Sequence, residues 1–362
     1  MFQTKAKVIK NIEVTKNYYK IALSSSWIAQ AAKPGQFLQV RVADNYEPLL
    51  RRPFSIHRVG YRLSVIGYRP QTAKPGKPNT IEILYEVVGK GTQILSQKKR
   101  GEYLDIIGPL GNGFDYKSPL DFARGRQVTP RLRSGQAGHP STSLGAGRSQ
   151  VLVAGGMGVA PLMFLAEKIT GHKVTKSVRS EAQPPRRGQS HKLKVLIGAK
   201  SKDQILCEKE FQRLGCEVKI ATDDGSRGFK GKVTDLLKKI LVTGHPSTSS
   251  FSKLRTSLGA SKSQVTGQKL ATCDLRLATI YACGPRPMLK EISRISKEYK
   301  IPAQISLEEH MACGIGACLG CVVKTQYSIP ACRQARRNTQ YRFQYKRVCK
   351  EGPVFDSQEV IW

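Results

Sequence analysis

The sequence contains no uninterrupted apolar stretch of the length that a membrane-spanning helix requires. Its longest apolar run, residues 151–166, is interrupted by glycines and falls short of the roughly 20 residues needed to cross a bilayer. The first residues lead directly into alternating apolar and polar sequence and lack the apolar core of a signal peptide. We therefore expect a cytoplasmic protein that does not engage a membrane.

Acidic residues are also scarce. The 362 residues include 26 Asp and Glu against 60 Lys and Arg, a formal net charge of +34. Such an excess first suggests a nucleic-acid or other anionic partner. The length predicts two or three domains, and a content of 40% hydrophobic and 24% charged residues excludes a disordered chain. Nine cysteines in a cytoplasmic protein indicate metal or redox chemistry more than disulfides.

Four segments have the composition of insertions. Residues 138–143 recur identically as 244–249, within segments 123–149 and 242–274, and segments 174–190 and 328–340 share the same Ser, Gly, Pro and Arg content. They are either basic arms that bind nucleic acid or insertions tolerated at surface junctions. The near absence of aromatic residues for base stacking favours insertions, and the larger part of the positive charge lies outside them. Nucleic acid is therefore not an expected partner.

The first 122 residues read as strands separated by Gly and Pro turns, which predicts an antiparallel β-barrel. The strand-like runs are Val8–Ile12, Tyr19–Leu23, Phe37–Val42 and Leu63–Ile66.

Two motifs in this region suit phosphate and flavin binding. Residues Arg52–Ser55 combine a guanidinium, which can fork onto a phosphate, with a hydroxyl three residues later. A strand ending at Leu84–Glu86 then leads through Gly91 into a helix whose free N–H groups suit a pyrophosphate, with Thr92 as the expected N-cap.

Residues 150–303 change to alternating strands and helices, which predicts an open parallel α/β domain. A buried-strand run at Val151–Ala154 enters the glycine-rich turn Gly155–Pro161 and then a helix, the arrangement of a nucleotide site. Expected strands follow at Leu193–Gly198, Glu217–Thr222 and Thr279–Cys283, with helices at Lys232–Lys239 and Pro287–Tyr299. Ligands bind at the carboxyl ends of such strands, where residues 222–225 and 283–285 lie. Cys283 has no potential metal-ligating neighbour close in sequence, so we interpret it as a small wall residue.

The region 304–362 carries the most specific motif. Cys313, Cys318 and Cys321 have the C-x4-C-x2-C spacing of plant-type [2Fe–2S] clusters, whereas zinc sites usually show paired C-x2–4-C elements. Either Cys332 or Cys349 can supply the fourth thiolate. We favour Cys349, because Cys332 lies among arginines in the suspected insertion 328–340, and a turn and apolar anchor follow Cys349.

The order of these motifs resembles the electron transfer subunit of class 1B dihydroorotate dehydrogenase, in the ferredoxin reductase superfamily. The residues that carry the resemblance are 52–55, 108–114, 155–161, 222–225, 283–285, 313–321 and 348–353. It implies an N-terminal flavin-binding β-barrel (1–122), an inserted basic linker (123–149), a central parallel α/β nucleotide-binding domain (150–303, with insertions 174–190 and 242–274) and a C-terminal [2Fe–2S] domain (304–362, with insertion 328–340).

The resemblance also implies site residues, although no residue is assigned a catalytic role. One FAD per subunit would be held by Arg52, Pro53, Phe54, Ser55, Leu84, Tyr85, Glu86, Gly91 and Thr92. The nicotinamide nucleotide would border Gly155, Gly156, Gly158, Ala160, Pro161, Asp223, Cys283, Gly284 and Pro285. One [2Fe–2S] cluster per subunit would be held by Cys313, Cys318, Cys321 and Cys349.

The function that the resemblance implies is electron transfer between an FMN-containing, dihydroorotate-oxidising subunit and NAD in pyrimidine biosynthesis, within a heterotetramer of two copies of each subunit. The small subunit of an NADPH:ferredoxin oxidoreductase or sulfide dehydrogenase is the alternative. The sequence leaves NAD and NADP open, because Asp203 favours the first and Lys200 and Lys202 favour the second.

Overall fold

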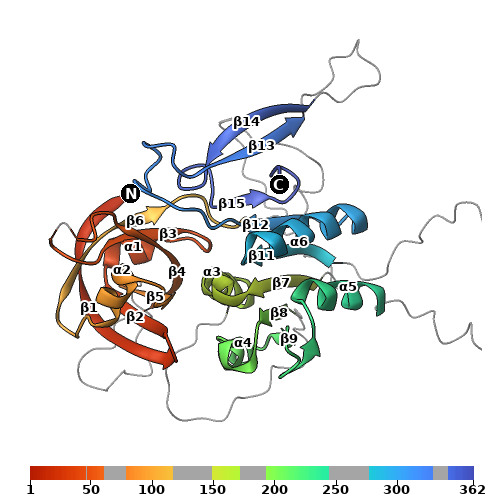
Figure 1. Cartoon of the computed structure of the whole chain (residues 1–362), viewed down its shortest axis with the longest axis horizontal. Coiled ribbons are helices and arrows are strands. Elements are labelled where there is room, and N and C mark those ends of the chain that lie inside the picture. The colour runs from red at the N-terminus through yellow and green to blue at the C-terminus, as the bar shows by residue number, and fades with distance from the viewer. Residues whose placement is uncertain (46, 61–78, 117–148, 172–192, 244–276, 329–340) are drawn as a thin grey trace, which may run out of the picture.

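The structure is a computed structural model that describes residues 1–45, 47–60, 79–116, 149–171, 193–243, 277–328 and 341–362. The chain forms a barrel, a seven-stranded sheet with helices on both faces and a two-stranded hairpin (Figure 1). The expected mixed β and α/β fold is confirmed.

The barrel is closed and has the strand order β1-β2-β5-β4-β3-β6. Small and branched apolar side chains alternate into its interior, among them Ile21, Leu23, Val40, Ile56 and Ile83. Three of the four expected strands lie in β1, β2 and β3, and the run Leu63–Ile66 lies outside the described residues. The strands are β1 (Phe2–Thr15), β2 (Tyr18–Ser24), β3 (Phe37–Arg41), β4 (Arg52–Gly60), β5 (Thr80–Glu86) and β6 (Tyr103–Leu110), with helices α1 (Ser26–Ala31) and α2 (Lys90–Ser96).

Helix α2 begins earlier than the sequence predicted. The N-cap is Gly89, and Thr92 is the third residue of the helix, so the assignment of Thr92 as the N-cap is wrong. The Thr92 hydroxyl instead accepts hydrogen bonds from the backbone N–H groups of Val88 (2.9 Å) and Gly89 (3.2 Å) and donates to the Gly89 carbonyl (3.0 Å). The side chain thus closes the strand-to-helix turn from inside the helix.

The sheet has the strand order β10-β9-β8-β7-β11-β12-β15. Its members are parallel except β15, which pairs antiparallel with β12. The strands are β7 (Ser149–Gly155), β8 (Lys194–Ala199), β9 (Glu217–Thr222), β10 (Phe229–Lys230), β11 (Leu277–Cys283), β12 (Ala303–Ser306) and β15 (Val354–Asp356). Because β15 follows the cluster cysteines, the sheet continues past the expected domain limit at residue 303, and that limit cuts through β12.

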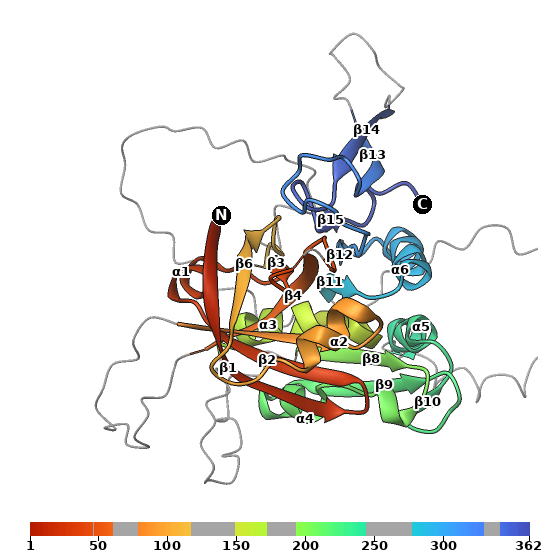
Figure 2. The same cartoon turned by 60° about the vertical axis from the view of Figure 1, so that its left-hand side comes forward.

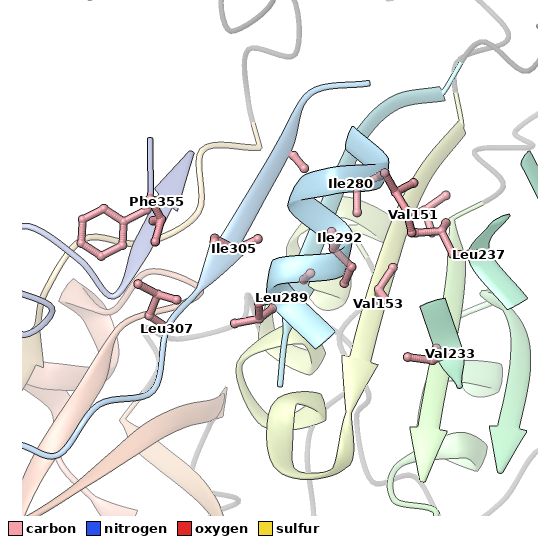
Figure 3. Packing of buried hydrophobic residues seen from close by; sticks show 14 of the residues in the cluster. Val151, Val153, Val233, Leu237, Ile280, Leu289, Ile292, Ile305, Leu307 and Phe355 are labelled. Carbon is pink, nitrogen blue, oxygen red and sulfur yellow. The ribbon is translucent and has the colours of Figure 1, made fainter. Parts of the chain in front are cut away.

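Helices cover both faces of this sheet, as its continuous apolar strands require. Val151 and Val153 point toward α5 and α6 on one face, where they pack with Leu237 and Leu289 (Figure 3). The alternate residues of β7 pack with α3 and α4 on the other face. The helices are α3 (Val159–Thr170), α4 (Glu208–Arg213), α5 (Val233–Thr243) and α6 (Arg286–Tyr299), with short 3-10 turns at Gly156–Gly158 and Lys202–Gln204.

The C-terminal region adds a hairpin of β13 (Val322–Ser328) and β14 (Tyr341–Arg347), which extends away from the sheet (Figure 2). One apolar core joins this region to the other two. Phe37 of the barrel, Leu307 beyond β12 and Val348 and Phe355 of the cluster region belong to the same buried cluster. The cluster loop is therefore packed against the barrel and the sheet together.

A partly buried group of charges joins the barrel to the sheet on the other side. Lys20 of β2 and Arg58 of β4 both pair with Glu210 of α4, and the Arg58 Nη2 atom lies 3.0 Å from the Glu210 carboxylate. Arg58 Nε also lies 3.0 Å from a Glu167 carboxylate oxygen on α3. The fully buried His57 ring hydrogen-bonds through Nδ1 to the Ala160 carbonyl (3.1 Å).

The suspected insertions lie almost entirely outside the described residues. At their edges, Ser149 belongs to β7, residues 242 and 243 belong to α5, and Ser328 belongs to β13. These four residues of the suspected insertions thus belong to described strands and a helix. Among the described helices, none is both long and apolar enough to cross a membrane.

Candidate functional site

The two predicted flavin-binding motifs meet in the structure. The Arg52 side chain lies against Gly91, where an added Cβ would approach Arg52 Nε to 2.8 Å. Arg52 Nη1 also donates to the Leu50 carbonyl (2.6 Å), which orients the guanidinium at the start of β4. Gly89, at the N-cap of α2, has open space where a Cβ would be. A guanidinium beside an uncovered glycine turn fits the diphosphate of a dinucleotide.

Within the segment Leu84–Glu86, the side chain of Tyr85 belongs to the barrel core. Tyr85 points into the barrel core, where it packs against Tyr19 and Phe54 with ring centroids 5.7 Å apart and donates a hydrogen bond to Asn11 (3.1 Å). Burial raises the pKa of Tyr85, so its hydroxyl stays protonated. Its side chain supports the barrel, which leaves the backbone of this strand end for contact with a flavin.

The glycine-rich turn after β7 and the turn after β11 form one surface. Strands β7 and β11 are neighbours, with Ala154 opposite Cys283. A Cβ on Gly158 would come within 1.9 Å of the Cys283 carbonyl oxygen, and one on Gly155 within 2.8 Å of Pro285. Gly156 has φ +52° and open space where its Cβ would lie. The structure thus brings 155–161 and 283–285 together around an uncovered turn, which fits a nucleotide phosphate.

Cys283 and Asp223 differ in their surroundings. The Cys283 thiol is buried, lies 3.9 Å from a Glu308 carboxylate oxygen, and has a pKa that burial raises well above its ordinary value. It is therefore a neutral thiol, in keeping with a wall residue. Asp223 is exposed at the carboxyl end of β9, where its backbone N–H donates to the Ala199 carbonyl (3.1 Å).

The four favoured cluster cysteines lie as two interacting pairs. The Cys318 N–H donates to the Cys313 Sγ at 3.4 Å, and the Cys349 N–H donates to the Cys321 Sγ at 3.4 Å. Two thiolates for each of two irons is the ligand pattern that a [2Fe–2S] cluster requires. The donor set therefore fits the cluster. Cys332 lies outside the described residues.

Backbone N–H groups prepare Cys313 for a metal. Its Sγ accepts hydrogen bonds from the N–H groups of Ala317 (3.3 Å) and Cys318 (3.4 Å). Burial alone would raise the pKa of Cys313, but the donors of Cys318, Ile315 and Ala317 around its Sγ lower the pKa to about 6. The loop turns through Gly314 and Gly316, whose φ angles of +70° and +87° favour glycine.

Arg347 holds this loop from the hairpin. Its Nη1 donates to the Gly316 carbonyl (2.7 Å), and its Nε donates to Glu351 (3.0 Å). Sequence reasoning did not single out Arg347, because Arg347 ends a strand and Glu351 lies in the turn after it, where no regular spacing marks the pair.

The turn 108–114, which the sequence marked without a role, contacts the cluster region. The Asn112 N–H donates to the Gly352 carbonyl (2.5 Å), and its side-chain amide donates to the Glu351 carbonyl (2.9 Å). These bonds fasten the end of β6 to the turn that follows Cys349.

One further group offers metal-ligating atoms. His57, Cys207 and Glu210 place one ligand atom each within 4.8 Å of one another. Lys20 and Arg58 already pair with the Glu210 carboxylate, so their positive charges oppose a cation there.

Comparison with known proteins gives consistent matches. Residues 308–361 match the family model for the iron-sulfur cluster binding domain of dihydroorotate dehydrogenase B. The chain is 34% identical to the dihydroorotate dehydrogenase B (NAD(+)) electron transfer subunit of Desulforamulus reducens, over 99% of this chain and 97% of that protein. It is 33% identical to the subunit of the same name from a Geobacillus species, over 100% of this chain and 99% of that protein.

Solved structures share the fold. An NADH-dependent reduced ferredoxin-NADP oxidoreductase matches 99% of this chain and 90% of that chain with a TM-score of 0.60 and 22% identity. A ferredoxin reductase of carbazole 1,9a-dioxygenase matches 83% of this chain and 67% of that chain, with a TM-score of 0.51 and 15% identity.

Proposed function

Because the chain belongs to the dihydroorotate dehydrogenase B electron transfer subunits, we propose that it passes electrons between a dihydroorotate-oxidising subunit and NAD⁺. The observation that carries the proposal is the packing of a four-cysteine loop against both the barrel and the sheet. In that arrangement, a flavin at the barrel would have a nucleotide turn on one side and an iron–sulfur cluster on the other.

Arg52 and the Gly89–Thr92 turn would hold the diphosphate of FAD. Their contact supports this assignment, since the Arg52 guanidinium and the start of α2 face the same uncovered region. Pro53, Phe54 and Ser55 follow along β4, and the strand end Leu84–Glu86 lies on β5, which pairs with β4. FAD, when bound, couples the two-electron hydride transfer of the nicotinamide to the one-electron transfer of the cluster.

The uncovered turn 155–161, with 283–285 beside it, would bind the nicotinamide nucleotide, and Asp223 would border the same strand ends. Cys283 would form a neutral wall there. Close packing of Gly158 on the Cys283 carbonyl keeps the two turns in one fixed relation, so that they act as one binding surface.

Cys313, Cys318, Cys321 and Cys349 would hold the [2Fe–2S] cluster. The N–H donors to Cys313 favour its thiolate, and Arg347 holds the Gly316 carbonyl in place. Dihydroorotate itself would be oxidised on an FMN-containing partner subunit, in a heterotetramer with two copies of each subunit.

The proposal is tested by producing the chain together with an FMN-type dihydroorotate dehydrogenase subunit and purifying the complex without oxygen. We expect flavin absorbance, an EPR signal of a reduced [2Fe–2S] cluster, and dihydroorotate-dependent reduction of NAD⁺. A complex without flavin and cluster signals, or with both but no NAD⁺ reduction, would reject the proposed function.

The alternative, a small subunit of an NADPH:ferredoxin oxidoreductase or sulfide dehydrogenase, predicts a different nucleotide preference. The nucleotide-selective candidates lie just after β8, where Asp203 is exposed in the 3-10 turn Lys202–Gln204. Stopped-flow reduction of the flavin by NADH and by NADPH separates the two functions, since this alternative requires NADPH to be the faster reductant.

A further inference from the structure

Strand β3 presents a buried amide toward the cluster loop. Residues i and i+2 of a strand share a face, so Gln39 lies on the same side of β3 as Phe37. Phe37 packs outside the barrel in the apolar cluster that contains Cys321 and Cys349, whereas the intervening Leu38 packs inside the barrel. Gln39 therefore belongs to the face of the barrel that meets the iron–sulfur region.

The Gln39 side chain has no hydrogen-bond partner among the described residues. It is 0% exposed, and both its Nε2 and its Oε1 atoms are buried without a partner. A buried amide that has given up its bonds to water costs free energy unless a partner replaces them. An unpaired amide at this position thus points to a partner that the polypeptide itself does not supply.

The amide lies directly against the loop that carries the first cluster cysteine. A Cβ on Gly314 would come within 2.1 Å of Gln39 Nε2 and within 2.6 Å of its Cδ. Two features therefore require glycine at 314. Its φ is +70°, and Gln39 occupies the space that a Cβ would need. The contact places the amide next to the residue that follows Cys313.

The same strand touches the predicted flavin segment. Gln39 pairs with Pro53 of β4 on one side and with Ile107 of β6 on the other. Phe37 and Leu38 pair with Ser55 and Phe54. Gln39 thus stands on the strand between the segment expected to hold FAD and the loop expected to hold the cluster.

We propose that Gln39 is a positioning residue of the electron relay, whose amide Nε2 donates a hydrogen bond to a sulfur on the Cys313 side of the cluster. The inference rests on the proposed function, because it requires the cluster to be bound. Hydrogen bonds to the sulfurs stabilise the more negative, reduced form and so raise the reduction potential. Gln39 would thereby set the driving force between flavin and cluster.

Two variants test this in the complete complex with its catalytic subunit. Gln39→Leu removes both polar atoms at nearly constant volume, and Gln39→Met removes them while keeping the unbranched shape of the side chain. We expect the midpoint potential of the cluster, from an EPR-monitored redox titration, to shift to more negative values in both. The g-values of the reduced cluster should also shift, while the flavin potential and the iron content stay at wild-type values.

Gln304→Leu is the matched control. Gln304 is also a buried glutamine, but its amide is satisfied by the Asp115 backbone, accepting from the N–H (2.9 Å) and donating to the carbonyl (2.6 Å). Loss of the Gln304 amide should leave the midpoint potential of the cluster unchanged.

An unchanged cluster potential in iron-loaded Gln39 variants overturns the inference, and a shift confined to the flavin assigns the amide to the flavin instead. If Gln39→Leu fails to retain iron, the potential of Gln39→Met decides. A wild-type complex without flavin and cluster signals would reject the proposed function itself, so the two failures are distinguishable.

Discussion

At the scale of single residues, the cluster depends on which thiol completes each pair. Cys349 is buried beside Cys321, and the backbone N–H of Cys349 donates to the Cys321 Sγ. A serine at 349 would replace the soft sulfur ligand with a hard hydroxyl. We expect Cys349→Ser to abolish the EPR signal of the reduced cluster and to lower bound iron.

Cys332→Ser is the corresponding control, because Cys332 is the other candidate for the fourth ligand. This variant should keep the wild-type EPR signal. The opposite pair of results would assign the ligand to Cys332.

A second prediction for a single residue concerns Gly158. Its φ is ordinary at −58°, so a substitution adds no backbone strain. The added methyl group of Gly158→Ala would nevertheless meet the Cys283 carbonyl oxygen at 1.9 Å and force the two nucleotide turns apart. We expect a rise in KM for NADH of at least tenfold, which corresponds to about 1.4 kcal/mol, measured by flavin reduction, with the cluster EPR signal retained.

Gly171→Ala, at the other end of α3, controls for helix stability. Gly171 has φ +67° and open space at its Cβ, so alanine there adds backbone strain of roughly 1–2 kcal/mol but no clash. A KM for NADH that rises equally in both variants would contradict the proposed role of the Gly158 contact.

At the scale of secondary-structure elements, the barrel is joined to α3 and α4 through the charges around Glu210. Burial alone would raise the pKa of Glu210, but the neighbouring His57 ring, 3.9 Å away, and the positive charges of Lys20 and Arg58 lower it well below its ordinary value of 4.5. Ionised Glu210 therefore stabilises the folded state above about pH 4.5, and this contribution is lost as the pH falls toward the lower folded-state pKa.

Glu210→Gln should lower the free energy of unfolding at pH 7 by about 3 kcal/mol, because it leaves Lys20 and Arg58 without their shared carboxylate. Urea unfolding at a series of pH values measures this difference, which should shrink below pH 4.5. A difference that is constant with pH would contradict the argument.

Glu208→Gln provides the matched control on the same helix. Glu208 pairs with the exposed Arg227 at 2.9 Å, and surface pairs of this kind contribute up to about 1 kcal/mol. Its effect should be smaller than that of Glu210→Gln.

The elements that sequence could predict are those with a strong local pattern. The apolar run Val151–Ala154 and the glycines after it identify a buried strand and its turn, and both occur as expected in β7 and the turn 155–161. Strand β15 has three residues and pairs with β12, some fifty residues earlier, so no local periodicity marks it. The burial of Gln39 also has no sequence signal, because a single polar residue in an alternating strand indicates a position that faces solvent. Its burial depends on a loop almost three hundred residues away.

At the scale of the whole molecule, the net charge of +34 needs no nucleic-acid partner. The insertions contain almost no aromatic residues, and base stacking is what sequence-tolerant single-strand binding requires. A variant that lacks 123–148 and 244–274 should therefore keep the affinity for single-stranded RNA of the full chain across a salt series, measured by fluorescence anisotropy. A marked loss of affinity and of salt dependence would identify these segments as binding arms.

The antiparallel pairing of β15 with β12 links two events in the biogenesis of the protein. Residues of the cluster loop are synthesised between these two strands, so β12 remains an open sheet edge until the ribosome has passed all four favoured cysteines. An open edge is a site for unwanted pairing with other chains. This edge of the sheet is therefore closed only after the segment that carries all four favoured cysteines has been made, and a chain truncated anywhere before β15 would leave β12 unpaired on that side.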